Sequence, residues 1–323
     1  MSNSADRSSA SRASPLPGIT GLRFIAACMV LFAHGTLFTT QFQDSARWSA
    51  FWSCMGSMAM TLFFVLSGFV IHYNYCDLFK TKPTSSALWT FFSARIARLY
   101  PMYVCCFLLY LASVPIAASF PDKLHIAPLQ LTFTQSWLYL AAGENQTATN
   151  IFFAHSWPIS TEFGFYLLFP FIVRPIGLMR RRSIVSVALC ITVVASLYMS
   201  YWMATHPDDL IHLCTRVIGG DAKTHSYFPG WLGYFFPLTR FPEFCTGCLA
   251  AQLFRTVQDR SKGKRETAIG CFCILISLLV VAGFIRQFTG ESSISVLRKM
   301  SVNYLLAPAT PPSFFARLGI LRS

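Results

Sequence analysis

The sequence predicts an all-α fold, a polytopic bundle of transmembrane helices, and three observations lead to this class. Only 12% of the 323 residues are charged and 54% are hydrophobic, whereas soluble domains carry about 25% charged residues. The mean hydropathy of +0.49 leaves too little polar surface to cover a water-exposed globule. The apolar residues also gather in stretches close to the ~20 residues that cross a bilayer. These observations exclude an ordinary soluble domain and predict the lipid bilayer as a partner.

The predicted elements follow in chain order. Residues 1–17 are rich in Ser and lack hydrophobic periodicity, which predicts a disordered cytoplasmic tail. The apolar stretch 19–40 has no convincing small-residue cleavage site, so we expect it to be a retained helix. Further spans are predicted at 51–74, 99–119, 156–173, 183–204, 228–254 and 266–285, with weaker segments at 126–142 and 300–309.

The predicted spans form one transmembrane domain at 18–310, followed by a short tail at 311–323. Segment 126–142 contains Gln130 and Gln135, which predicts that it lies at the interface or re-enters the membrane instead of spanning it. The count is therefore about eight helices of bilayer-spanning length.

The distribution of Lys and Arg predicts the orientation. If the N-terminus is cytoplasmic, 15 of the 26 Lys and Arg residues fall in inner segments and seven in outer segments. Short cytoplasmic loops are enriched in these residues, which favours this topology. The formal net charge of +13 is then mostly topological, and we expect no nucleic-acid partner.

Five ionisable residues lie within predicted spans, where each costs about 2.5 to 3.5 kcal/mol on insertion scales. They are Arg23, His34, Glu162, Arg240 and Glu243. Arg23 and His34 are 11 residues apart, which places them on nearly the same helix face. His34 and Glu162 have similar predicted depths in the outer half of the membrane. A carboxylate that orients an imidazole is typical of a general base, although a buried His bonded to a backbone carbonyl is the alternative.

Two further arginines, Arg95 and Arg98, stand three residues apart at the predicted cytoplasmic entrance to the third span. Each guanidinium group can bind two phosphate oxygens at once, so this site suits an anionic ligand from the cytosol. The alternative is an anchor for lipid phosphates. Arg240 and Glu243 have i,i+3 spacing, which favours a structural ion pair. The outer histidines lack a close, ligand-like spacing, and we predict no metal site.

At these residues the sequence resembles the acyltransferase 3 family of bacterial membrane proteins, which move acyl groups from coenzyme A to carbohydrates and related acceptors. The first-span motif of the family is similar to T-G-L-R-F-I-A-A-C-M-V-L-F-A-H. Later motifs of the family are similar to F-F-V-L-S-G-F, R-I-A-R-L-Y-P, W-P-I-S-T-E-F-G-F-Y and R-F-P-E-F-C-T-G. These five matches occur in order at Thr20–His34, Phe63–Phe69, Arg95–Pro101, Trp157–Tyr166 and Arg240–Gly247.

The sequence departs from the family pattern at two places. Pro158 replaces the usual Ser of the fourth motif, and the family's closing L-G-x-I-S-Y-x-x-Y-L-x-H segment is at most begun at Leu318 and Gly319. The C-terminal end is therefore expected to be truncated or diverged. An inactive relative is one alternative function, and a permease or flippase for a polar glycan or lipid-linked substrate is another.

The resemblance implies roles for the named residues. His34 takes part in acyl transfer, as general base or as transient acyl carrier, with Glu162 as its partner. Arg95 and Arg98 bind the coenzyme A end of the donor, with Arg23 near its long arm. Ser67 has a packing role, with a nucleophilic role as the alternative.

The resemblance also implies the reactants and the location. No cofactor is bound permanently, because acyl-CoA, probed as acetyl-CoA, is the donor substrate. The acceptor is a hydroxyl of a cell-surface or exported carbohydrate or glycolipid. We expect a multi-pass protein of the bacterial inner membrane with a cytoplasmic N-terminus.

Overall fold

The computed structural model describes residues 16–35, 46–80, 83–113, 126–141, 147, 149 and 153–258. Within these ranges the regular structure is helical, apart from one isolated bridge between Ala141 and Thr147, which confirms the predicted all-α class. The long helices are α1 (Pro17–Gly35), α3 (Ala46–Tyr75), α4 (Ser85–Ser113), α8 (Trp157–Gly177), α9 (Arg182–Thr205) and α12 (Pro237–Gln258).

Shorter elements connect the long helices. They are the 3-10 turns η2 (Asp77–Phe79) and η3 (Ala154–Ser156), the helices α6 (Ala127–Leu131), α10 (Pro207–Ile218) and α11 (Phe228–Gly230), and the π-helical turn η4 (Trp231–Phe235). Among the described residues, five stretches are long and apolar enough to cross a membrane, as expected of a multi-pass membrane protein: Pro17–His34, Met55–Tyr75, Ser85–Ser113, Ala154–Gly177 and Arg182–Thr205.

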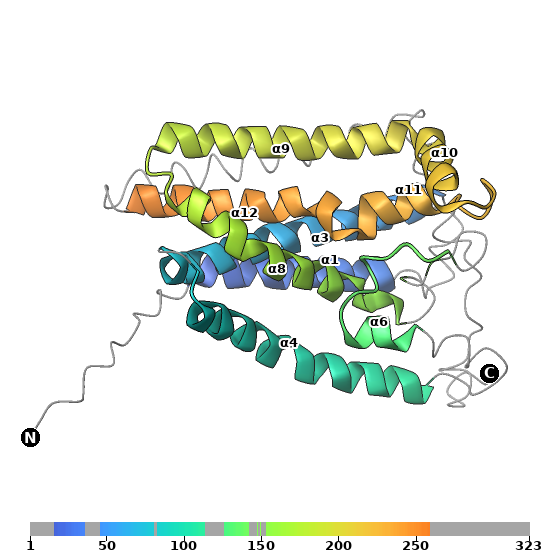
Figure 1. Cartoon of the computed structure of the whole chain (residues 1–323), viewed down its shortest axis with the longest axis horizontal. Coiled ribbons are helices and arrows are strands. Elements are labelled where there is room, and N and C mark those ends of the chain that lie inside the picture. The colour runs from blue at the N-terminus through green and yellow to red at the C-terminus, as the bar shows by residue number, and fades with distance from the viewer. Residues whose placement is uncertain are drawn as a thin grey trace, which may run out of the picture.

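The long helices alternate in direction across the bundle (Figure 1). Helices α3, α8 and α12 end where α4 and α9 begin, and we call this side the α3–α4 end. The short helices α6 and α10 lie at the opposite side, the α6–α10 end. Any residue in a long helix can therefore be placed by its distance in sequence from these two ends.

The centre of the bundle is the contact between α3 and α12, and two glycines bring these helices together. A Cβ atom added at Gly68 would overlap the carbonyl oxygen of Phe244, and one added at Gly247 would overlap the carbonyl oxygen of Val65. Small residues allow helix backbones to approach closely without a side chain between them. Helix α1 packs on α3, and α8 and α9 pack on α12, so this close pair positions the rest of the bundle.

The third predicted span, 99–119, was placed too late in the sequence. Helix α4 begins at Ser85 and ends at Ser113. The two arginines, Arg95 and Arg98, predict a membrane boundary, but they lie in the interior of this helix. The helix also continues through Pro101.

The predicted span at 228–254 is divided. The chain passes through α11 and η4, becomes extended at Phe236 (φ −69°, ψ 127°), and starts α12 at Pro237. A residue that precedes proline is driven out of the helical region by the proline ring, which accounts for the break. The predicted segments 266–285 and 300–309 and the two terminal tails at 1–15 and 311–323 lie outside the described residues.

Candidate active site

A cavity of about 410 Å³ opens among α1, α3, α4 and α8. This volume lies within the range of 300 to 1,000 Å³ that small-molecule sites occupy. Its lining combines apolar side chains with four charged ones, all of which were singled out from the sequence. The lining residues are Arg23, Val30, Met60, Phe63, Phe64, Arg95, Arg98, Leu99, Pro158, Ile159, Glu162 and Tyr166.

Arg95 is the most enclosed of the cationic groups. It lies ten residues into α4, and only 8% of its surface is exposed. Its guanidinium carbon lies 4.5 Å from the ring centre of Tyr75 and 5.9 Å from that of Tyr166, which are attractive cation–π distances. Its Nε atom is buried without a hydrogen-bond partner. The Arg95 side chain is therefore enclosed by aromatic rings and faces the cavity.

Glu162 belongs to the same cationic region. The hydroxyl of Ser67 donates a hydrogen bond of 2.5 Å to its Oε1 atom, and the Tyr166 side chain is a second hydrogen-bonding neighbour. Arg23 interacts electrostatically with Glu162 and with both α4 arginines. Ser67 is therefore more than a small residue for helix packing, because its hydroxyl holds the carboxylate of Glu162, which lines this cavity.

His34 lies beside another histidine. Its ring centre is 4.9 Å from that of His155, and the two rings cross at 73°. His34 stands one helical turn beyond Val30, which lines the cavity, so the histidine pair lies next to the cavity on the side of the α6–α10 end. Within the described residues, no hydrogen bond joins His34 to Glu162. His34 contacts His155, and Glu162 follows His155 by seven residues. At about 1.5 Å per helical residue, this places Glu162 about 10 Å farther along the helical segment.

His155 is positioned by a buried polar connection. It belongs to η3, whose last residue Ser156 donates a hydrogen bond of 2.7 Å to Oε1 of Gln130 and receives one of 3.1 Å from Nε2 of Gln135. Both glutamines are fully buried. Segment 126–142 is thus not a spanning helix, as predicted, but its polar residues are buried in protein, where irregular backbone is tolerated at membrane depth.

Arg240 and Glu243 form the structural ion pair that their spacing favours. Nη1 of Arg240 lies 2.8 Å from Oε1 of Glu243, and the hydroxyl of Thr61 donates a 3.2 Å hydrogen bond to the same oxygen. The guanidinium also lies over the ring of Phe64 at 5.3 Å. Because Phe64 lines the cavity, this pair supports the cavity wall from behind.

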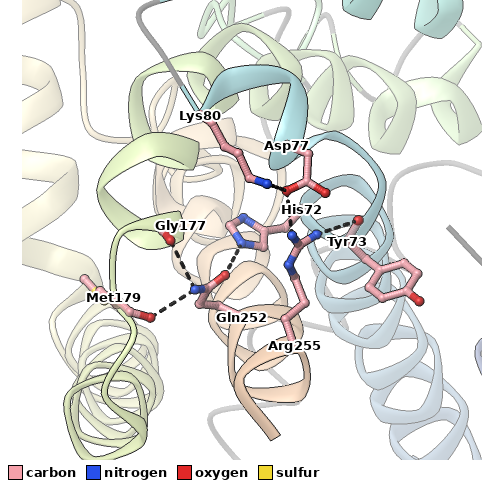
Figure 2. A network of polar contacts seen from close by, with 8 residues as sticks. All are labelled: His72, Tyr73, Asp77, Lys80, Gly177, Met179, Gln252 and Arg255. Carbon is pink, nitrogen blue, oxygen red and sulfur yellow. Dashed lines mark hydrogen bonds and ion pairs between the residues drawn. The ribbon is translucent and has the colours of Figure 1, made fainter. Parts of the chain in front are cut away.

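A separate polar network joins three helices at the α3–α4 end (Figure 2). His72 of α3 is fully buried, and its Nε2 lies 3.0 Å from Oε1 of Gln252 in α12. The amide nitrogen of Gln252 donates to the carbonyl oxygens of Gly177 and Met179, so its oxygen must be the acceptor for His72. Sequence reasoning missed this network, since neither His72 nor Gln252 belongs to a recognisable motif.

Charged residues continue the network to the surface. Arg255 donates to Asp77 at 2.6 Å and to the carbonyl oxygen of Tyr73 at 3.3 Å, and Lys80 lies 2.9 Å from Asp77 (Figure 2). Burial alone would raise the pKa of Asp77, but the hydrogen bonds from Lys80 and Arg255 outweigh it, and the pKa lies below its usual value. The network connects α3, α8 and α12 at the α3–α4 end, and its residues are not among those that line the cavity.

The described residues contain no cluster of three or more His, Cys, Asp or Glu side chains suited to a metal ion. Cys245 and Cys248 are free thiols within α12. The candidate site therefore consists of a cationic cavity with one carboxylate and an adjoining histidine pair.

Comparison with known proteins shows which sequences this chain resembles. A model of the acyltransferase domain family matches residues 16–320. The chain is 28% identical to acyltransferase MdmB of Streptomyces mycarofaciens over 271 residues, which cover 79% of this chain and 61% of that protein. It is 22% identical to O-acetyltransferase OatA of Staphylococcus aureus over 317 residues, 94% of this chain and 46% of that protein.

The chain thus spans less than two thirds of the length of these two curated relatives. No solved structure matches it. The family match extends beyond Gln258, the last described residue, and includes most of the C-terminal part of the sequence.

Proposed function

The chain belongs to the acyltransferase domain family, and from this membership we propose that it is a membrane O-acyltransferase that uses acyl-CoA as donor. The acceptor is a hydroxyl group of a cell-surface or exported carbohydrate or glycolipid. The protein acts in the bacterial inner membrane with its N-terminus in the cytoplasm.

The observation that carries this proposal is the charge of the cavity. Three arginines and one carboxylate line it, so two positive charges are left without a counter-charge among the lining residues. Arg95 is buried, where an unpaired charge is costly, and its Nε atom adds a donor without a hydrogen-bond partner. A phosphate-containing ligand supplies both the charge and the acceptor oxygens.

The surface charge supports entry of this donor from the α3–α4 end. Six Lys and Arg residues of the described part lie there, at the ends of α8, α9 and α12 and next to η2. Cytoplasmic loops are enriched in these residues. The positions are Lys80, Arg174, Arg180, Arg181, Arg182 and Arg255.

The donor's phosphates then contact Arg95 and Arg98, and its thin arm extends along the cavity past Arg23 toward Val30 and His34. His34 takes the proton of the acceptor hydroxyl while the hydroxyl oxygen bonds to the thioester carbon. As the carbon–sulfur bond breaks, the departing thiolate of coenzyme A takes that proton from His34. In the alternative route, His34 first accepts the acyl group itself and then passes it to the acceptor hydroxyl.

Transfer of label tests the proposal. Membranes that contain the protein are incubated with radiolabelled acetyl-CoA, and label in the carbohydrate and glycolipid fractions is measured. We expect His34→Gln to abolish transfer, and we expect His212→Gln to retain it, since His212 is exposed on α10. Equal transfer by the wild type and His34→Gln would remove His34 from the reaction.

A further inference from the structure

The contacts of Glu162 raise the question of what a carboxylate does inside an anion-binding cavity. Its hydrogen-bonding neighbours are Ser67 and Tyr166, and its electrostatic partner is Arg23. A carboxylate in this position competes with any phosphate for the same guanidinium groups. It therefore weakens the binding of the ligand that the arginines attract.

We infer that Glu162 is the internal counter-ion of Arg23, Arg95 and Arg98, and that it sets how tightly the cavity holds its anionic ligand. The inference rests on the proposed function, because it concerns the donor site of that reaction. It assigns Glu162 to donor binding and release instead of to the orientation of His34.

The charges give this inference its direction. Among the described residues that line the cavity, three arginines and one carboxylate leave two excess positive charges, which attract a phosphate-containing ligand. Without that carboxylate the excess among these residues is three, which attracts the same ligand more strongly. The carboxylate thus lowers the positive charge of the site and limits the affinity, so that spent coenzyme A can leave.

Ser67 determines where the carboxylate stands. It is 97% buried on α3, and its hydroxyl reaches across to α8. Its neighbour Gly68 is locked against α12 by the close backbone contact. The position of Glu162 is therefore set by the rigid centre of the bundle, which makes Ser67 a positioning residue for the counter-ion.

Equilibrium binding of coenzyme A and of inorganic pyrophosphate to the purified protein tests the inference. We expect Glu162→Gln to tighten the binding of both probes about tenfold or more, because a unit charge a few ångströms from the ligand is removed from a poorly solvated site. We expect Arg23→Gln to weaken binding by a similar factor. Asp77→Asn is the matched control, since it removes a carboxylate outside the cavity, and its affinity should equal that of the wild type.

The double variant Arg23→Gln/Glu162→Gln guards against misfolding, because Arg23 and its electrostatic partner Glu162 are removed together. It restores an excess of two positive charges, and we expect an affinity within about threefold of the wild type. An affinity as weak as that of Arg23→Gln alone would overturn the counter-ion role. Unchanged or weaker binding by a folded Glu162→Gln protein would overturn it as well.

The two probes separate this inference from the proposed function. If pyrophosphate binds with the expected order of affinities and coenzyme A does not bind at all, the counter-ion role stands and the proposed donor is wrong. If the wild type binds coenzyme A but Glu162→Gln changes only the pH profile of acyl transfer, the proposed donor stands. Glu162 is then a partner of the reacting histidine, and the counter-ion role is overturned.

Discussion

At the residue scale, the enclosure of Arg95 determines what the cavity can bind. Its guanidinium stacks on Tyr75 and retains a free, buried Nε donor. A lysine at this position would keep the charge but lose the planar fork and the stacking. The type of cation, and not only its charge, is thus part of the site.

We therefore expect Arg95→Lys to raise the KM for acetyl-CoA about tenfold or more, the effect of losing a charge-assisted hydrogen bond. The turnover number should change much less. The matched control is Arg174→Lys, an exposed arginine near the end of α8. Kinetics with acetyl-CoA as the varied substrate check the prediction, and an equal KM in Arg95→Lys would contradict it.

The contact between His155 and His34 leads to a second prediction. His155 does not line the cavity, so we expect His155→Gln to leave the KM for acetyl-CoA unchanged. The turnover number should fall about tenfold or more, since a small displacement of the reacting group is costly. A change in KM alone would show instead that His155 belongs to the donor site.

The sequence placed the chemistry-bearing residues well but not all of their partners. Arg23, Arg95, Arg98 and Glu162 line one cavity, although predicted depth placed Glu162 beside His34 and the two α4 arginines at the cytoplasmic entrance. The partner of His34 could not be predicted, because η3 is a short turn whose place depends on buried hydrogen bonds to a distant segment. No periodic pattern records such contacts.

At the scale of elements, the approach of α3 to α12 fixes the frame that carries the site. We expect Gly247→Ala to lower the thermal midpoint in detergent, because the added methyl group would overlap the backbone at Val65. Forcing atoms into a packed contact costs about 1 to 3 kcal/mol. Gly21→Ala on α1 is the control, since a Cβ atom there meets nothing within 4 Å. Its midpoint should stay the same or rise, and equal midpoints for both variants would contradict the close-contact account.

The network around Asp77 predicts a dependence of stability on pH. The pKa of Asp77 is lowered in the folded protein, so its stabilising effect is present above its ordinary value of 3.8 and is lost as the pH falls through the lower, folded-state value. Because the carboxylate is half exposed, we expect Asp77→Asn to cost at most about 1 kcal/mol near neutral pH.

Thermal unfolding of the wild type and Asp77→Asn at several pH values checks this expectation. The difference between the two midpoints should shrink as the solution is acidified below about pH 4. A difference that grows on acidification would contradict the assigned direction of the pKa change.

Element boundaries were less predictable than the elements themselves. The start of α4 was predicted too late because arginines usually mark a membrane boundary, yet here aromatic rings enclose Arg95 inside the protein. The break before α12 had a visible local signal in Pro237. The apolar run continues on both sides of the proline, which favours a single span over a broken one.

At the scale of the whole molecule, a cationic cavity inside the bundle and basic residues at the α3–α4 end describe one path for an anionic donor. The histidine pair lies toward the opposite end. Donor and acceptor can then approach the reacting group from different sides of the membrane. The orientation of the chain and the identity of the donor are therefore linked claims.

Binding of radiolabelled acetyl-CoA to sealed membrane vesicles tests both claims at once. We predict saturable binding to inside-out vesicles that contain the wild-type protein, and little binding to right-side-out vesicles. The variant Arg95→Ala/Arg98→Ala should lose binding in inside-out vesicles at equal protein content. Equal binding by this variant, or binding confined to right-side-out vesicles, would contradict the account.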